Sequence, residues 1–323
     1  MKAILVREFG DPSAVTVSEI DDRDPSGHEV KVRVHGVGVG YFDGLLVKGE
    51  YQMKPPLPFT PGSSLSGVVE AVGANVTHLT PGDHVAGFGL LGGLAEYTCL
   101  PGNFVFKIPD SIPLDDAANF FIAYATAVYG LKELGKLREG ETVLILGASG
   151  TTGSTAIEVA RAVGAKVIAC ASTDEKRAHC LELGADAAVD YTQPDWRKAA
   201  KAAAGRQGVD VVYDPIGGDF AEPALRTMAP GGRYLVVGFV AGIASIPINL
   251  PLIKRCSIIG VNWGGEVMGN PTVVKPVIDQ LIAWSESGAL ASGPDATYSL
   301  EQTGEAFASL FGRASTGKIV IRC

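Results

Sequence analysis

The segment "TVLILGASGTTGSTAIEVARAVG" constrains the fold more than any other part of the chain. An apolar run ends at Gly147, and Gly150 and Gly153 follow just before a helical pattern begins. A strand that turns through three glycines into a helix lets the backbone approach a pyrophosphate. A tight strand-to-helix corner would also need small residues, so the surrounding pattern has to decide between the two.

The residues after this segment alternate between strand-like and helical patterns. After the strand at 142–147 we expect a helix at 154–165, a second helix capped by Thr173 or Asp174, and a helix with a turn at 220–232. Further strands are expected at 166–170, 187–191, 209–215, 233–239 and 257–264. This alternation indicates βαβ units and a parallel sheet with ligands at the carboxyl ends of its strands. In this context the three glycines predict a dinucleotide-binding loop.

Residues 1 to about 120 have a different pattern. Short alternating stretches such as "EVKVRVHGVGV" are separated by Gly and Pro turns, as in "TPGDHVAGF". Regular short strands of this kind predict a small β-barrel or sandwich. The 323 residues are enough for two such domains.

Charge and composition exclude several classes of protein. The net charge of −8 argues against a nucleic-acid binder, which needs clustered positive charge. No apolar run approaches the ~20 residues of a membrane span, so we expect a cytoplasmic protein without a membrane partner. The five cysteines and five histidines show neither C-x-x-C spacing nor ligand-like pairing, so neither a disulfide framework nor a metal site is expected.

The end of the second strand of the parallel sheet favours NADPH over NADH. An NAD site usually places Asp or Glu there, on the ribose 2′-hydroxyl, whereas this chain has Ser172 after Ala171. Ser172 can donate a hydrogen bond to a 2′-phosphate, and Lys176 can bring positive charge. Lys176 can also be an ordinary solvated helix residue, and Asp174 lies nearby.

The whole chain resembles the zinc-independent medium-chain dehydrogenase/reductase superfamily, in its NADPH:quinone oxidoreductase branch. The resemblance lies in "KPPLPFTPGSSLSGVVEAVG", "GGLAEYTCLPGNFVFKIPDSI", "GASGTTG", "GADAAVDYT", "GVDVVYDPIGGDF", "MAPGGRYLVVGF" and "GKIVI". It implies an α/β protein: a Rossmann doubly wound parallel sheet at 123–264, plus a GroES-like β-barrel catalytic domain at 1–122 and 265–323. It also implies a homodimer in which the last Rossmann strands pair.

The same resemblance implies the site residues. Tyr51 and Thr126 are the expected catalytic residues, and Thr126 also lies near the nicotinamide. Cofactor-binding positions are Tyr41, Ser149, Gly150, Thr151, Thr152, Gly153, Ser172, Lys176, Tyr191, Gly238, Phe239, Val240, Asn262, Trp263 and Lys318.

The chain also departs from the family at informative positions. Ser63 and Ser64 stand where zinc-dependent relatives carry metal ligands, so no catalytic metal is expected. Gly40 replaces a usual Asn near the nicotinamide, and Tyr41 is either a substitute for it or a packing residue. Thr151 places a Cβ in the loop that is usually "GGVG".

The expected reaction is hydride transfer from NADPH to a quinone, which needs no dedicated acid. One alternative is reduction of an enone or enoyl thioester, for which Tyr51 or Tyr41 would be the proton donor. The other is a non-catalytic NADPH-binding sensor or structural protein, suggested by Gly40 and Thr151. The sequence does not identify the physiological acceptor.

Overall fold

The computed structural model describes residues 1–291 and 293–323, which form two compact units. Unit 1 comprises Met1–Ala123, Asn270–Glu286 and Ser292–Cys323, and unit 2 comprises Tyr124–Gly269 and Ser287–Ala291. No helix among the described residues is long and apolar enough to cross a membrane. The domain limits stated above remain a prediction.

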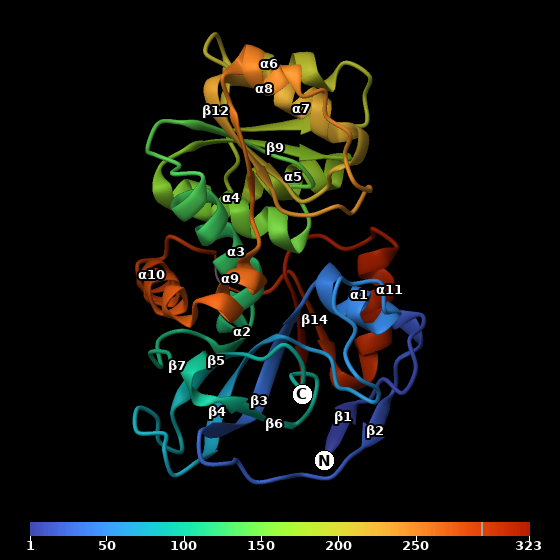
Figure 1. Ribbon diagram of the computed structural model, residues 1–323, viewed down its shortest axis with the longest axis vertical. Coiled ribbons are helices and arrows are strands. Elements are labelled where there is room, and N and C mark those ends of the chain that lie inside the picture. The colour runs from blue at the N-terminus through green and yellow to red at the C-terminus, as the bar shows by residue number, and fades with distance from the viewer. Residues whose placement is uncertain (292) are drawn as a thin grey trace. The chain divides into compact units, whose positions relative to one another are not determined.

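Unit 1 is built on a seven-stranded, mostly antiparallel sheet in the order β14-β15-β3-β4-β5-β7, with β6 also paired to β3 and a separate β1-β2 ribbon (Figure 1). Its strands are β1 (Lys2–Ile4), β2 (Val17–Glu19), β3 (Glu29–Val39), β4 (Ser64–Val72), β5 (His84–Phe88), β6 (Tyr97–Pro101), β7 (Val105–Lys107), β14 (Ala296–Ser299) and β15 (Ile319–Arg322). Alternate valines of β3, including Val30, Val32 and Val34, are buried in its core. The predicted GroES-like domain is therefore confirmed as an antiparallel-rich unit.

Short helices connect the strands of unit 1. They are η1 (Pro12–Ala14), α1 (Tyr41–Lys48), η2 (Gly102–Phe104), α2 (Leu114–Ala117), η6 (Pro271–Val273), α10 (Val274–Glu286), η7 (Leu300–Gln302) and α11 (Thr303–Phe311). The π-helical turn η3 (Phe120–Tyr124) runs across the boundary into unit 2.

Unit 2 contains a six-stranded parallel sheet in the order β10-β9-β8-β11-β12-β13. Its strands are β8 (Thr142–Ile145), β9 (Lys166–Ala171), β10 (Ala187–Asp190), β11 (Val209–Asp214), β12 (Met228–Val236) and β13 (Ser257–Gly260). The chain order reverses between β8 and β11, which is where doubly wound folds bind dinucleotides. The predicted fold class is therefore confirmed.

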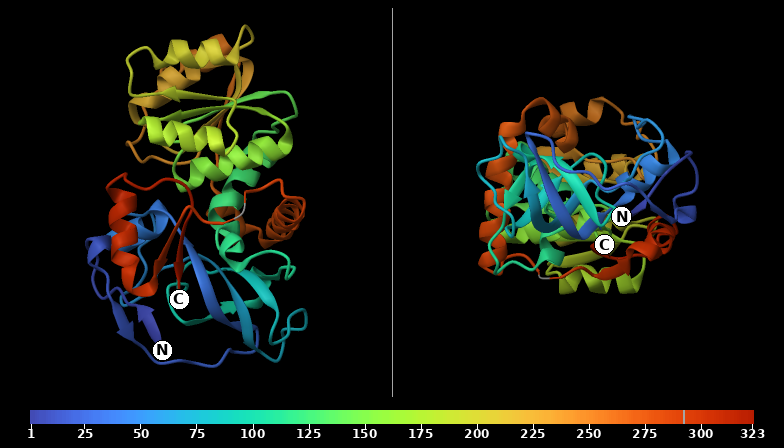
Figure 2. Two further views of the ribbon diagram at one scale, coloured as in Figure 1. Left: turned by 180° about the vertical axis from the view of Figure 1, so that it is seen from behind. Right: turned by 90° about the horizontal axis from the view of Figure 1, so that it is seen from below.

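Helices cover both faces of this sheet (Figures 1 and 2). The connecting elements are α3 (Ala125–Ala127), η4 (Val128–Leu134, π-helical), α4 (Thr151–Val163), α5 (Asp174–Glu182), α6 (Trp196–Ala204), η5 (Gly218–Phe220), α7 (Ala221–Thr227), α8 (Asn249–Lys254) and α9 (Trp263–Gly269). On the face of α6 to α8, Trp196, Leu225 and Leu250 pack on Leu144 and Tyr234 of the sheet.

Two local predictions were wrong. Residues 228–232 were expected to form a turn, but β12 begins at Met228 and carries an irregular register opposite Val209 and Val211. The last strand was expected to reach 264, but β13 ends at Gly260 and α9 begins at Trp263. The Asn262 side chain accepts the Gly265 N–H at 3.0 Å, and this cap starts the helix instead of extending the strand.

Candidate functional site

The three glycines between β8 and α4 serve three different purposes. Gly147 has φ +56°, and a Cβ there would lie 2.4 Å from Ile216 Cδ1, so it is the residue that turns the chain. A Cβ on Gly153 would lie 2.4 Å from the Gly147 carbonyl oxygen and 2.6 Å from Ala148 Cα. Gly153 is therefore needed for close packing of α4 on the turn after β8.

Gly150 differs from both neighbours, because its own protein surroundings do not require a glycine. A Cβ at this position would meet only the Gly147 oxygen, at an ordinary 3.6 Å, and φ is −82°. Gly150 is the N-cap of α4 and offers no side chain to the first turn of the helix. The space at Gly150 fits the close approach of a pyrophosphate oxygen to the backbone.

The first turn of α4 supplies the other residues predicted for this loop. Thr151, Thr152 and Gly153 open the helix, where N–H groups have no partner within the helix and the helix dipole is positive. Ser149, the residue before Gly150, is buried. The residues present therefore fit a dinucleotide pyrophosphate.

The parallel topology brings most of the other predicted cofactor residues to one edge of the sheet in unit 2. Ser172 follows β9, Tyr191 follows β10, Gly238 comes two residues after β12, and Asn262 comes two residues after β13. The carboxyl ends of parallel strands share one edge, so these residues and the α4 N-terminus lie along it.

The end of β9 contains a cation that the sequence analysis missed. The Arg177 guanidinium lies 3.3 Å from Asp190 Oδ2, pairs with Asp174, and donates to the Ala171 carbonyl at 3.4 Å. Lys176, which was predicted, is half-buried beside it, and its backbone N–H donates to the Thr173 cap of α5. The sequence analysis missed Arg177 because its contact with Asp190 joins segments that are distant in sequence.

Tyr191 lies at the same edge of the sheet. Its ring meets the Phe220 ring edge-on at 4.7 Å, which joins the loop after β10 to the one after β11. Asp190, which precedes it, accepts the Thr192 hydroxyl at 2.6 Å.

The loop after β12 contains Gly238, Phe239 and Val240, and Asp214 forms hydrogen bonds that position it. The Asp214 carbonyl accepts the Gly238 N–H at 3.2 Å, and its carboxylate accepts the Tyr234 hydroxyl and the N–H groups of Ile216 and Gly217 at 2.7 and 2.8 Å. Burial raises the pKa of Asp214, and burial and Asp214 raise the pKa of Tyr234. Phe239 is largely exposed.

The predicted nicotinamide segment of unit 2 centres on Trp263. Trp263 is buried, and its ring lies 5.4 Å from that of Tyr129, which the sequence analysis did not single out. The Tyr129 hydroxyl donates to Glu266 at 3.3 Å, and burial raises the pKa of this phenol. Thr126 is half-buried on α3, one helical turn before Tyr129.

The remaining predicted residues belong to unit 1. Tyr51 is half-buried with Phe42 edge-on at 4.6 Å, and burial raises the pKa of its phenol, which stays protonated at neutral pH. Tyr41 stacks on Phe311 at 4.4 Å, and its contact with the cofactor stays a prediction. Lys318 is buried, and its backbone N–H donates to Asp295 at 2.6 Å.

A buried carboxylate that the sequence analysis overlooked lies beside the departures at Gly40 and Ser63. Asp43 accepts the Gly40 N–H at 3.0 Å and the Ser63 hydroxyl at 3.2 Å, and burial raises its pKa to about 6. Ser64 donates to the Ala118 carbonyl at 2.7 Å. Both serine hydroxyls therefore make hydrogen bonds within unit 1.

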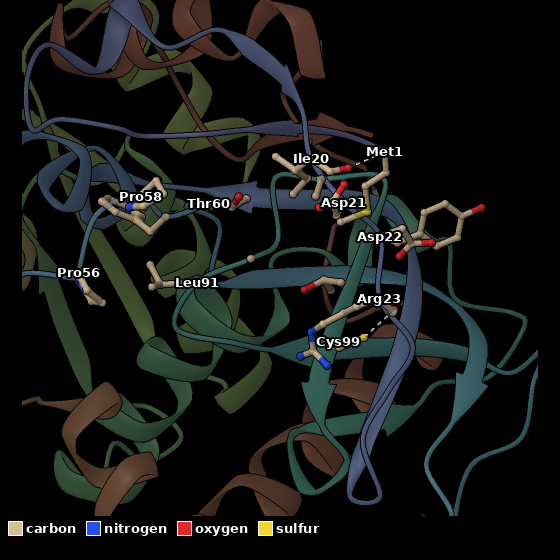
Figure 3. Close-up of a pocket in the computed structure, with 15 residues that line it drawn as sticks. Met1, Ile20, Asp21, Asp22, Arg23, Pro56, Pro58, Thr60, Leu91 and Cys99 are labelled. Carbon is tan, nitrogen blue, oxygen red and sulfur yellow. Dashed lines mark hydrogen bonds between the residues drawn. The ribbon is translucent and has the colours of Figure 1, made fainter.

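The pocket drawn in Figure 3 lies in unit 1 and has a volume of about 410 Å³. Two of its charged residues form ion pairs, since Arg23 binds Glu29 at 2.7 Å and Asp22 binds Lys31 at 2.6 Å. Its lining contains none of the described residues that were predicted for the site.

Comparisons with known proteins agree with this arrangement. Residues 26–110 match the alcohol dehydrogenase GroES-like domain, and residues 151–283 match the zinc-binding dehydrogenase family. Quinone oxidoreductase-like protein 2 of Rattus norvegicus is 37% identical over 322 residues, which are 99% of this chain and 91% of the relative. Quinone oxidoreductase of Homo sapiens is 32% identical over 324 residues, which are 99% of this chain and 97% of the relative.

A solved structure of a quinone oxidoreductase also resembles this chain over its full length. Quinone oxidoreductase of Escherichia coli complexed with NADPH has a TM-score of 0.91 and 25% identity, and the match covers 100% of both chains. A GroES-like unit and a parallel dinucleotide-binding unit in one chain define a two-domain dehydrogenase/reductase. The chain belongs to the medium-chain dehydrogenase/reductase superfamily, in its NADPH:quinone oxidoreductase-like branch, and is an oxidoreductase.

Proposed function

We propose that this oxidoreductase uses NADPH to reduce a quinone. The observation that carries the proposal is the likeness over 99% of the chain to relatives named quinone oxidoreductase. The cofactor is NADPH, as in the Escherichia coli structure, and Ser172 and Lys176 after β9 suit its 2′-phosphate. The acceptor itself is the part that needs testing.

The chain's own residues hold the cofactor in this proposal. The backbone at Gly150 and the first turn of α4 bind the pyrophosphate, and Tyr191 covers the adenosine end. Trp263 and Asn262 border the nicotinamide, and Thr126 contributes from α3. The role of Lys318 in cofactor binding stays a prediction. When bound, NADPH supplies the hydride that reduces the acceptor.

Tyr51 is the proposed orienting residue for the acceptor. The Tyr51 phenol is protonated at neutral pH, and burial raises its pKa further, so it can donate a hydrogen bond to an acceptor oxygen. A quinone suits such a site because its reduced form takes protons from water. An enone needs a proton delivered to carbon, which a phenol of raised pKa does poorly.

Zinc independence is part of the proposal and is supported by donor chemistry. The Ser63 hydroxyl donates to Asp43 and the Ser64 hydroxyl donates to Ala118, so both positions carry neutral, hydrogen-bonded oxygens. Zinc sites in proteins use thiolate, imidazole and carboxylate ligands. Elemental analysis of the purified protein should give less than about 0.1 zinc per chain, and stoichiometric zinc would refute this part.

The function is tested by NADPH oxidation with a panel of acceptors. We expect 9,10-phenanthrenequinone to react faster than an enone or an enoyl thioester, and oxidation of a simple alcohol with NADP⁺ to be negligible. Faster reduction of the enone or enoyl thioester would replace the quinone with that substrate class. Saturable NADPH binding without turnover of any acceptor would identify a binding protein instead.

We also propose a homodimer formed through the edge strand β13. Five residues from the loop after β12 to β13 are 41% to 85% exposed although they are large and apolar: Ile243, Ile248, Leu252, Ile253 and Ile258. An edge strand beside such a surface can pair with the same strand of a second copy. Ile258→Lys should convert a dimer to a monomer in analytical ultracentrifugation, whereas Leu181→Lys, at an exposed apolar position on α5, should not. A monomeric wild type would refute the proposal.

A further inference from the structure

Arg177 connects three points at the end of β9 where the ribose 2′ position of a dinucleotide lies in this fold. Its guanidinium contacts Asp174 of α5, Asp190 at the end of β10, and the Ala171 carbonyl that ends β9. The side chain is 19% exposed, whereas the Asp174 side chain is 95% exposed. Arg177 and Asp190, whose side chain is 22% exposed, are therefore both largely shielded from solvent, whereas Asp174 faces solvent.

The two carboxylates affect a 2′-hydroxyl and a 2′-phosphate in opposite ways. A carboxylate here accepts a hydrogen bond from a 2′-hydroxyl, which is how NAD-binding proteins use an acid at this position. The same carboxylate repels the dianionic 2′-phosphate of NADPH. Arg177 balances part of this charge and contacts one oxygen of each carboxylate. The Asp190 oxygens also accept hydrogen bonds from Thr192 and Gln193, which are neutral groups.

We infer that Arg177 sets the preference for NADPH over NADH indirectly, by holding Asp174 and Asp190 in an ion-paired state. This inference rests on the proposed cofactor site and adds a positioning residue to it. Lys176 acts on the phosphate through its own charge, whereas Arg177 acts through the carboxylates. A planar guanidinium can contact two carboxylates and a carbonyl at once, and a lysine ammonium cannot keep that geometry.

The test uses two ligands that differ only in the 2′-phosphate, adenosine 2′,5′-bisphosphate and adenosine 5′-monophosphate. Their dissociation constants are measured by isothermal titration calorimetry, so no acceptor is needed. In Arg177→Gln we expect the preference for the bisphosphate to fall about tenfold, which corresponds to about 1.4 kcal/mol. Arg177→Lys should give an intermediate loss, because it keeps the charge without the fork.

A double-mutant cycle separates the indirect effect from a direct one. In an Asp174→Asn background the effect of Arg177→Gln should shrink to threefold or less, whereas the effect of Lys176→Ala should stay unchanged. Arg161→Gln is the matched control, because it removes one guanidinium from the exposed surface of the same unit and should leave the preference unchanged. Asp174→Asn alone should raise the preference about threefold.

The outcomes distinguish this inference from the proposed function. If the wild type does not prefer the bisphosphate, both the NADPH site and the inference are overturned. If the wild type prefers it but Arg177→Gln retains that preference, only the inference is overturned. If Arg177→Gln does not fold by circular dichroism, the result with Asp174→Asn decides, and an unchanged preference there refutes the inference.

Discussion

Alanine substitutions at Gly150 and Gly153 should produce different defects, one in NADPH binding and one in stability, although the two glycines are only three residues apart. Gly150→Ala should weaken NADPH binding and leave the stability of the free protein almost unchanged. Gly153→Ala should lower the stability of the free protein. Both expectations come from the atoms that an added methyl group would meet.

The magnitudes follow from the packing. At Gly153 the new Cβ would lie 2.4 and 2.6 Å from backbone atoms, which cannot rotate away, so α4 has to shift. Overpacking of this kind costs about 1–3 kcal/mol, and the higher helix propensity of alanine returns up to about 1 kcal/mol. A net loss of about 1–2 kcal/mol lowers Tm by about 2–8 °C in a domain of this size.

At Gly150 the new Cβ meets one atom at 3.6 Å, and the change from a glycine to an alanine N-cap costs less than about 1 kcal/mol. The methyl group instead occupies the space through which the backbone meets the pyrophosphate. We expect at least a tenfold increase in the Kd for NADPH, about 1.4 kcal/mol or more.

The assay is thermal unfolding with and without NADPH, with Kd measured by calorimetry. At an NADPH concentration 100 times its Kd, the wild type should gain about 2.7 kcal/mol. Gly150→Ala should unfold near the wild-type temperature without NADPH and show a smaller gain with it. Wild-type NADPH affinity in Gly150→Ala would refute the assignment of this loop.

Three further predictions concern buried and half-buried polar groups. The Tyr213 hydroxyl is buried without a hydrogen-bond partner among the described residues, whereas the Tyr234 hydroxyl donates to Asp214. In urea titrations, Tyr213→Phe should therefore raise the unfolding free energy by about 1 kcal/mol, and Tyr234→Phe should lower it by about 2 kcal/mol. Equal effects of the two variants would contradict this reasoning. Burial raises the pKa of Asp43 from 3.8 to about 6, so the native state binds this proton more tightly than the unfolded state does. The stability contributed by Asp43 therefore falls by up to about 3 kcal/mol as the pH rises from about 4 to 6. Asp43→Asn should remove that fall, and parallel stability curves for wild type and variant would count against it. Tyr51→Phe should lower kcat for 9,10-phenanthrenequinone by about tenfold or less in steady-state kinetics, and a larger loss would indicate obligatory proton transfer.

The parallel sheet was predictable because its signals are local. Apolar runs at 142–147 and 166–170 and the glycine turn between them specify a strand, a turn and a helix without distant contacts, and β8, α4 and β9 form there. The errors occurred where strand pairing or a side-chain cap overrides a local signal, as at 228–232 and at Asn262. Pro230 and two following glycines indicate a turn, yet β12 begins at Met228, which pairs with Val209, and its regular pairing with β11 resumes only at Arg233.

The contacts of the candidate site were less predictable, because they join residues that are far apart in sequence. Tyr129 and Glu266 are 137 residues apart, so no spacing rule links them. Asp43 looks like an ordinary helix residue in "YFDGLLVK", and only burial beside Ser63 makes it a titrating group near pH 6. Sequence patterns indicated which strand ends carry the site but not the ion pairs that hold those ends in place.

The buried network below the glycine turn connects stability with cofactor binding. The Ile216 side chain packs against the turn at Gly147, where a Cβ would lie 2.4 Å from Ile216 Cδ1, and the Ile216 N–H donates to Asp214 at 2.7 Å. Asp214 in turn accepts the Tyr234 hydroxyl, so a tyrosine inside β12 sets the position of the loop against which the glycine turn packs. Because β8 and β11 flank the point where strand order reverses, a shift of this loop changes the distance between the two sides of the dinucleotide crevice. Loss of the Tyr234 hydroxyl should therefore raise the Kd for NADPH as well as lower stability, whereas loss of the Tyr213 hydroxyl should leave that Kd unchanged.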